Sequence, residues 1–231
     1  MRDEAIVALQ PICAVSPVDI PDDDWARRSQ ENLKPITVGR ITVVAPWHVE
    51  PPATSHDAIT IVIVPSMGFG TGHHATTRLC LASLQAIDLT GVFALDVGTG
   101  SGVLAIAAVQ LGAARALGLD DDPDAIQSAV ENLALNFAAH PSQTVAFAVG
   151  DLMAMELPLA DVVTANLTGS LLIRAAERLR QALKPGGVLI ASGLQASERD
   201  EVQQAFAGLE IVNEAEEDGW ITFTGRALSN E

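Results

Sequence analysis

A glycine-rich turn preceded by an acid is the part of this chain best suited to hold a ligand. The apolar residues 91–95 end at Asp96, and Gly98, Gly100 and Gly102 follow at alternating positions. Glycines let the backbone approach a ligand where a Cβ would clash. Asp120 ends the next apolar stretch, about 20 residues after Gly98, where an acid can receive the hydroxyls of a ribose. These residues predict a nucleoside-binding site.

Polar residues also follow two later apolar stretches. Residues 144–149 and 160–165 are predicted strands, and a polar side chain stands just after each of them. The carboxyl ends of parallel strands share one edge of a sheet, and ligands bind there where the strand order reverses. We therefore expect four strand-end residues to border one cofactor site: Asp96, Asp120, Asp151 and Asn166.

The spacing of the glycines distinguishes two classes of cofactor. Dinucleotide sites use G-x-G-x-x-G, which seats a pyrophosphate on a helix N-terminus. Here the pattern is G-x-G-x-G, and the preceding Asp96 would repel a pyrophosphate but suits the cationic amino-acid end of S-adenosylmethionine. The pattern predicts an S-adenosylmethionine-dependent methyltransferase, and a dinucleotide oxidoreductase is the weakest alternative.

The elements that must position these residues alternate along the chain. Strands are predicted within 36–44, at 58–64, before Asp96 and Asp120, and at 144–149, 160–165 and 188–192; helices are predicted at 76–87, after Gly102, and at 124–137, 170–183 and 196–207. This alternation predicts a mostly parallel sheet with right-handed crossovers. Residues 184–187 are expected to form a turn, and 209–215 and 220–224 an antiparallel hairpin. The expected fold class is α/β, a Rossmann-like seven-stranded sheet with helices on both faces.

Composition excludes several other functions. The formal net charge is −16 and no basic stripe is present, so nucleic acid is not an expected partner. Such a surface would instead attract a basic protein. No apolar stretch reaches the roughly 18 residues of a membrane helix, and no signal peptide is recognisable. With two cysteines and no ligand cluster, we expect no metal, no membrane contact and a cytoplasmic location.

Longer motifs resemble a known family. DVGTGSGVLAIAAVQLGA followed by GLDDDPDAI is similar to class I S-adenosylmethionine-dependent methyltransferases. The loop GFGTGHHATTRLCLASL narrows the resemblance to the PrmA family, which methylates amino groups of large-subunit ribosomal protein eleven. The same family is matched by DDDWARRSQENLKPITVGRITVVAPWH, DVVTANLTGSLL, LKPGGVLIASGL and GWITFTGR, so that the resemblance covers about residues 20–226.

The resemblance implies roles for individual residues. Thr77, Gly98, Asp120 and Asn166 are expected to contact the cofactor, and the loop from Phe69 to His73 to close over its methionine end. Asn166 is also the expected catalytic residue, because it would orient the acceptor amine through its side-chain oxygen or nearby carbonyls. The full set of expected cofactor contacts is Phe69, Thr71, Gly72, Thr77, Asp96, Gly98, Gly100, Asp120, Asp151 and Asn166.

The N-terminus departs from the family pattern. The family carries an N-terminal domain that recognises the ribosomal protein, but only about twenty residues precede DDDW here, so we expect that domain to be short or absent. Residues 1–57 are expected to form an extension and linker, and residues 58–231 the methyltransferase domain. The expected partner is a basic ribosomal protein. A small-molecule methyltransferase and a non-catalytic S-adenosylmethionine-binding module remain alternatives, and the oligomeric state is left open.

Other conspicuous residues have structural explanations. Asp122, before Pro123, is expected to cap the next helix, and Cys80 to be a buried apolar residue. Trp220 is expected in the sheet core. His73 and His74 are expected to be loop residues beside the cofactor. The acids of the C-terminal hairpin are expected to form a solvated tip: Glu214, Glu216, Glu217 and Asp218.

Overall fold

A seven-stranded sheet organises the chain. The computed structural model describes residues 33–49, 57–65, 72–137 and 144–228, and the chain forms one compact unit from Lys34 onward. The helix predicted in WARRSQENL lies outside the described residues. The strands are β4 (Phe93–Val97), β5 (Arg115–Asp120), β6 (Val145–Val149), β7 (Ala160–Asn166), β8 (Leu183–Gln195), β9 (Leu209–Glu217) and β10 (Trp220–Ala227).

The order of these strands is β6-β5-β4-β7-β8-β10-β9. The five strands from β6 to β8 are parallel, and β10 is antiparallel to both β8 and β9. The predicted Rossmann-like sheet with its antiparallel hairpin is confirmed. The order reverses between β4 and β7, which is where such sheets bind ligands.

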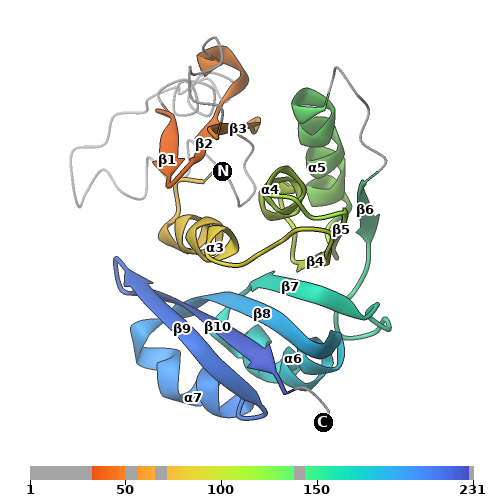
Figure 1. Cartoon of the computed structure of the whole chain (residues 1–231), viewed down its shortest axis with the longest axis vertical. Coiled ribbons are helices and arrows are strands. Elements are labelled where there is room, and N and C mark those ends of the chain that lie inside the picture. Colours follow the sequence, from red (N-terminus) through yellow and green to blue (C-terminus); the bar gives the residue numbers. More distant parts are fainter. Residues whose placement is uncertain (1–32, 50–56, 66–71, 138–143, 229–231) are drawn as a thin grey trace, which may run out of the picture. The chain divides into compact units, whose positions relative to one another are not determined.

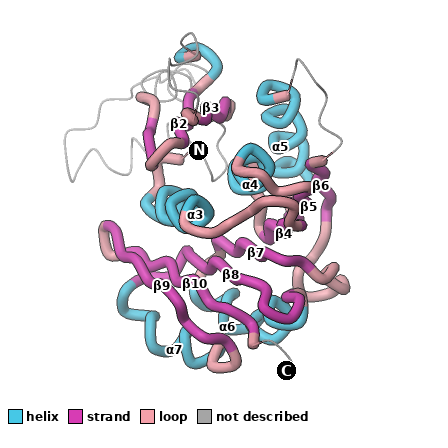
Figure 2. Tube along the Cα trace, in the orientation of Figure 1, coloured by secondary structure: helices cyan, strands magenta, loops and turns pink. Residues whose placement is uncertain are grey.

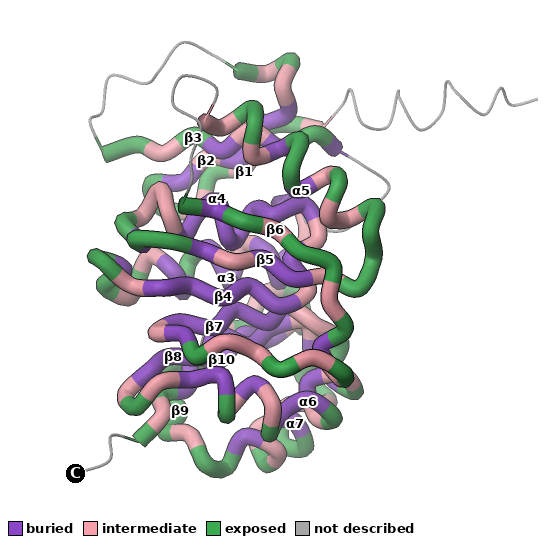
Figure 3. The backbone as a smooth tube through the Cα atoms, turned by 90° about the vertical axis from the view of Figure 1, so that its right-hand side faces the viewer, coloured by how far each residue is buried: buried purple, intermediate pink, exposed green. Residues whose placement is uncertain are grey.

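Helices cover both faces of the sheet (Figure 1). They are α3 (Ala75–Gln85), α4 (Val103–Gln110) and α5 (Pro123–Asn136) on one face, and α6 (Gly169–Gln181) and α7 (Arg199–Ala205) on the other. Successive residues of β4 point to opposite faces of the sheet. Leu95 lies in the same buried cluster as Leu172 of α6, whereas Ala94 lies in the cluster that contains Ile106 of α4. Figure 3 shows that the central strands β4 and β7 are buried along their length.

A three-stranded sheet precedes the larger one. It contains β1 (Ile36–Val38), β2 (Ile41–Val44) and β3 (Ile59–Val62), as predicted, with an antiparallel β1–β2 pair and a parallel β2–β3 pair. The amide oxygens of Asn132 and Asn136 in α5 accept hydrogen bonds from the backbone of residues 62 and 64. These side chains therefore satisfy backbone groups at the edge of the small sheet.

Two predicted boundaries are wrong. Residues 184–187 belong to β8 and not to a turn (Figure 2). Leu183 already pairs with Ala160 of β7, and a shift in the β7–β8 register accommodates the extra residues before Val188 pairs with Val162. The predicted helix at 196–207 begins as a 3₁₀ turn, Ala196–Glu198, and α7 follows it. Within the described residues, no helix is long and apolar enough to cross a membrane.

Candidate active site

The carboxyl ends of the parallel strands open onto a cavity of about 580 Å³. Five lining residues come from five neighbouring strands or from the turns that follow them. Their order along the sheet edge is that of the strands: Asp120 (β5), Gly98 (after β4), Asn166 (β7), Gly193 (β8) and Trp220 (β10). Asp120 and Trp220 therefore mark the two ends of the row, with Asn166 between them.

The glycine turn lets two loops cross closely. Gly98 has a φ of 73°, and a Cβ on it would lie 2.4 Å from Cδ2 of Leu167 in the loop after β7. The backbone N–H groups of Gly98 and Thr99 both donate to the carbonyl of Leu119, at 2.8 and 2.9 Å. The turn is thereby tied to β5, and Gly98 and Gly100 line the cavity; their contact with a cofactor stays a prediction.

Two backbone N–H groups hold the side chain of Asp120 in place. Its Oδ2 accepts from the N–H of Gly100 at 2.9 Å, and its Oδ1 accepts from the N–H of Asp122 at 3.1 Å. A carboxylate oxygen has two lone pairs, so each oxygen can still accept a hydroxyl of a ligand. The fixed carboxylate suits the predicted role at a ribose.

Asp96 lies behind the glycine turn and not among the residues that line the cavity. It is buried, and its two oxygens accept from the hydroxyls of Thr99 and Thr164, both at 2.6 Å. Burial raises the pKa of the Asp96 carboxyl above its ordinary value, and the two threonine hydrogen bonds oppose that rise. The structure gives Asp96 a clear part in shaping the turn, and its contact with a cofactor stays a prediction.

A smaller hollow of about 160 Å³ adjoins the cavity and shares Gly98, Asp120 and Leu167 with it. Asp151 lines this hollow, and its Oδ1 accepts from the N–H of Met153 at 2.7 Å. Asp151 is thus brought to the same end of the site as Asp120 but not into the larger cavity. The two hollows share lining residues and together form one candidate site at the strand ends.

The loop before α3 is only partly described. Phe69 and Thr71 lie outside the described residues. Gly72 is buried against Val43 and does not line the cavity. His74, in contrast, lines it as expected and caps α3, because its Nδ1 accepts from the N–H of Thr76 at 3.4 Å and lies 2.8 Å from the hydroxyl of that residue.

Two residues that line the cavity each carry a buried polar atom with no hydrogen-bond partner among the described residues. These atoms are the hydroxyl oxygen of Thr77 and Oδ1 of Asn166. Leaving such an atom unsatisfied costs about 1–3 kcal/mol, so each atom indicates a place for a ligand. A threonine hydroxyl can donate to a carboxylate and an amide oxygen can accept from an amine. Both groups fit the amino-acid end of S-adenosylmethionine or an amine acceptor.

Two further cavity residues were not predicted. Trp220 was expected in the sheet core, and that prediction is wrong: it lines the cavity, with its ring 4.8 Å from the ring of His74 at an angle of 67°. Because β10 runs antiparallel to β8, its first residue lies where the parallel strands end. Gly193 forms a bulge between the pairs Leu194–Ile221 and Ser192–Thr222. The predicted strand ended at residue 192, so the sequence placed Gly193 just outside it and gave no signal for this bulge.

The acids of the β9–β10 hairpin are 30–75% exposed, as predicted for a solvated tip, and each of them also pairs with an arginine. Arg78 of α3 contacts Glu217 and Asp218, and Arg199 of α7 contacts the remaining two acids, Glu214 and Glu216. Successive side chains of a strand point to opposite faces of the sheet. Glu214 and Glu216 therefore face α7 and pair with Arg199, whereas Glu217 faces α3 and pairs with Arg78. The hairpin is held from both faces.

Two structural predictions are confirmed. The side chain of Asp122 caps α5 by accepting from the N–H of Asp124 at 2.9 Å. Cys80 is fully buried, and burial raises the pKa of its thiol from 9.0 to about 12. A thiol with that pKa stays protonated at neutral pH and is a poor nucleophile.

Comparison with known proteins agrees with this geometry. Residues 3–227 match the family model described as ribosomal protein L11 methyltransferase (PrmA). The ribosomal protein L11 methyltransferase of Pseudomonas paraeruginosa is 38% identical over 210 residues, which are 90% of this chain and 69% of that protein. The protein of the same description from Azotobacter vinelandii is 39% identical over 208 residues, 89% of this chain and 69% of that protein.

Solved structures give the same result. The crystal structure of a ribosomal protein L11 methylase from Lactobacillus delbrueckii subsp. bulgaricus has a TM-score of 0.75 and 28% identity, covering 84% of this chain and 98% of that one. An RNA methyltransferase from Salinibacter ruber in complex with S-adenosyl-L-homocysteine shares the fold, with a TM-score of 0.54 and 20% identity over 68% of this chain and 96% of that one. With the strand-end cavity, the glycine turn and a family match over nearly the whole length, the chain belongs to the PrmA family and is an S-adenosylmethionine-dependent methyltransferase.

Proposed function

We propose that this chain transfers methyl groups from S-adenosylmethionine to amino groups of ribosomal protein L11. The observation that carries the proposal is that Thr77 and Asn166 line one cavity at the strand ends and that the Thr77 hydroxyl and Asn166 Oδ1 are buried with no hydrogen-bond partner among the described residues. They offer the polar contacts that an amino-acid tail and an amine need. The names of the relatives supply the acceptor.

Each part of the cofactor has a matching group in the chain. Asp120 would accept from the ribose hydroxyls, Gly98 and Gly100 would give the cofactor access to the backbone, and Thr77 would hold the methionine end. When bound, the cofactor supplies a methyl group that its positive sulfur has already activated. The remaining proposed contacts are Asp151 in the smaller hollow and, from the sequence, Phe69, Thr71, Gly72 and Asp96.

The acceptor amine would meet Asn166. Its Oδ1 can accept one N–H and so direct the nitrogen lone pair, which is an orienting role without proton transfer. A lysine acceptor has an ordinary pKa of about 10.4, and loss of its proton to water before docking suffices. Leu167, Leu171 and Trp220 give the cavity apolar walls that keep water from the reacting groups.

The charge of the chain supports a basic acceptor. With a net charge of −16, it attracts lysine-rich proteins, and such steering weakens as salt screens it. Rising salt should therefore increase the KM for a basic protein while leaving kcat nearly unchanged. A salt-independent KM would contradict this part of the proposal.

Methyl transfer to a defined acceptor tests the function. Purified protein, labelled S-adenosylmethionine and ribosomal protein L11 should give labelled L11, with the modified amino groups located by mass spectrometry. In a cell lysate, the label should enter the protein fraction. Label in small molecules with none in L11 would refute the proposal. Asn166→Ala should lower kcat by about 100-fold, as misorientation of an acceptor does, with the Kd for S-adenosylhomocysteine within about twofold.

We also propose residues 58–231 as the methyltransferase domain and residues 1–57 as an N-terminal extension. In support, all described residues that line the cavity fall between His74 and Trp220. We propose a cytoplasmic location on the same grounds as the acceptor, and cell fractionation tests it.

A further inference from the structure

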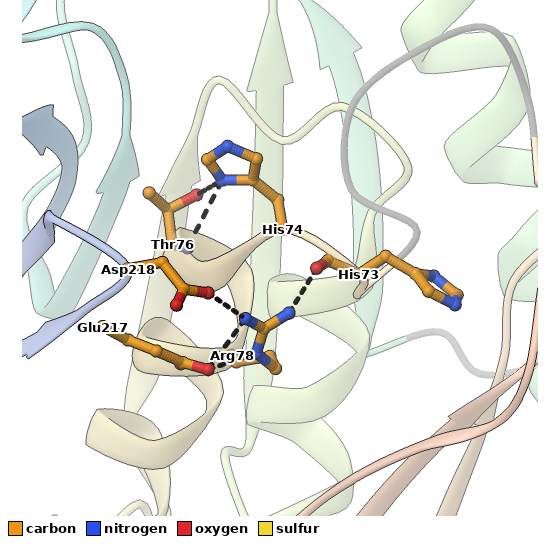
Figure 4. Close-up of polar contacts among 6 residues, drawn as sticks. All are labelled: His73, His74, Thr76, Arg78, Glu217 and Asp218. Atoms are coloured by element: carbon orange, nitrogen blue, oxygen red, sulfur yellow. Dashed lines mark hydrogen bonds and ion pairs between the residues drawn. The ribbon is translucent and has the colours of Figure 1, made fainter.

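One arginine joins three segments beside the cavity (Figure 4). Arg78 lies in the first turns of α3. Its Nε donates to Oε1 of Glu217 at 2.8 Å, and its Nη2 lies 2.7 Å from the same oxygen and 3.3 Å from Oδ2 of Asp218. Its Nη1 donates to the backbone carbonyl of His73. The guanidinium thus connects α3, the loop before it and the β9–β10 turn.

These contacts define the position of an aromatic pair. Glu217 and Asp218 are separated from Trp220 only by Gly219, and both turn residues have positive φ, 52° for Asp218 and 77° for Gly219. Holding this tight turn fixes where β10 begins. The carbonyl of His73 immediately precedes His74, whose ring contacts the ring of Trp220. Arg78 therefore holds the chain next to both members of the pair.

The aromatic pair stands at the acceptor end of the cavity. Along the sheet edge, Asp120 at β5 is the end suited to a ribose, and Asn166 at β7 is suited to the amine. Trp220 at β10 lies beyond Asn166 in that order, two strands further from Asp120. Trp220 and His74 therefore form a wall of the cavity on the side of Asn166 that is away from the ribose end.

We propose that Arg78 is a positioning residue for the methyl acceptor, acting through Trp220 and His74. The inference rests on the proposed function, because it takes the acceptor to be a protein amine. Arg78, Glu217 and Asp218 are 22, 39 and 75% exposed, so their ion pairs add little to the free energy of unfolding. Their effect is on the position of the hairpin turn.

A pair of arginine variants tests this role. Arg78→Ala should raise the KM for ribosomal protein L11 by about 10-fold, because the acceptor wall is no longer held, and leave the Kd for S-adenosylhomocysteine within about twofold. Arg199→Ala is the matched control, since Arg199 pairs with Glu214 and Glu216 on the opposite face of β9. It should change neither value. An Arg78→Ala variant with the KM of the Arg199→Ala control would overturn the proposal.

Two further readouts separate positioning from a general loss of structure. Arg78→Lys should fall between wild type and alanine, because lysine keeps the charge but places all its donors on one nitrogen, whereas the guanidinium contacts its partners from three nitrogens. The other two tryptophans are first replaced (Trp25→Phe and Trp47→Phe), so that the fluorescence comes from Trp220 alone. In this background, acrylamide should quench Trp220 fluorescence more strongly when Arg78→Ala is added than when Arg199→Ala or no further substitution is added. Unchanged quenching would also overturn the proposal. If the wild type fails to methylate L11, the proposed function fails, and the quenching experiment still decides on Arg78.

Discussion

Gly193 offers the sharpest test of how the site is built. Its φ is 91°, a conformation that side chains rarely adopt, and a Cβ there would lie 2.1 Å from the carbonyl oxygen of Leu167. Real Cβ atoms essentially never come closer than 3.0 Å to such an atom. The Gly193→Ala substitution must therefore push the loop that follows β7 outward by about 1 Å, since neither partner is the end of a flexible side chain.

The cost of this substitution has two parts. Positive φ in alanine costs about 1–2 kcal/mol, and loss of the 2.9 Å hydrogen bond from the N–H of Leu167 to the carbonyl of Ser192 costs about 1 kcal/mol. A total of about 2–3 kcal/mol lowers the Tm of a chain of this size by about 4–12 °C. Asn166 precedes the displaced residue, and a misplacement of about 1 Å in a catalytic group costs about 100-fold in kcat.

Gly91→Ala is the control for this prediction. Gly91 also has positive φ, 74°, but a Cβ there meets nothing within 4 Å. It should lower the Tm by about 2–8 °C, from the backbone cost of about 1–2 kcal/mol alone, and leave kcat at the wild-type value. Thermal unfolding and saturated methyl-transfer assays on both variants check the prediction. Equal Tm and kcat in the two variants would refute the reasoning that the loop after β7 is held by its approach to Gly193.

Three other substitutions test separate parts of the site. Thr77→Val removes a hydroxyl with no partner among the described residues, so the Tm should be unchanged or higher while calorimetry shows S-adenosylhomocysteine binding about 10-fold weaker. Asp120→Asn should weaken the same binding by about 10–100-fold, because charge-assisted hydrogen bonds are lost; unchanged affinity would contradict the ribose role. The folded pKa of Asp96 lies above its ordinary 3.8, so its contribution to stability falls as pH rises from 3.8 through the folded pKa. Asp96→Asn should remove that fall, so that the variant gains Tm relative to wild type as pH rises; parallel Tm curves would contradict it.

Local patterns explain which site residues could be predicted. Asp120 and Asn166 each end an apolar run, and a parallel sheet brings such ends together whatever the side chains of its helices. The position of Gly98 could also be predicted, because its glycine motif begins directly after β4. For these positions the sequence predicts both the strand and the residue at which the strand ends.

Other features depend on partners far along the chain. The ladder irregularity that keeps residues 184–187 in β8 depends on the register with β7, and the bulge at Gly193 on the register with β10. Arg78 and Glu217 are 139 residues apart, and no periodicity within either segment indicates that they meet. Trp220 is an intermediate case, because the predicted hairpin already implied an antiparallel strand beginning at the ligand edge.

Because of the strand order, the parts of the site that depend on local sequence and the parts that depend on distant segments lie at different ends of the cavity. β4 and β5 follow one another along the chain and are joined by α4, so the ribose end is built from one continuous stretch, residues 93–120. The end beyond Asn166 is assembled from α3, β8 and β10, which are distant in sequence and meet only in the folded sheet. Substitutions of the cavity-lining residues in the first stretch should therefore act on cofactor affinity and not on the acceptor. Substitutions that move the hairpin against α3 should act on the acceptor more than on the ribose end of the cofactor, since the hairpin contributes Trp220 to the cavity but no residue at the Asp120 end.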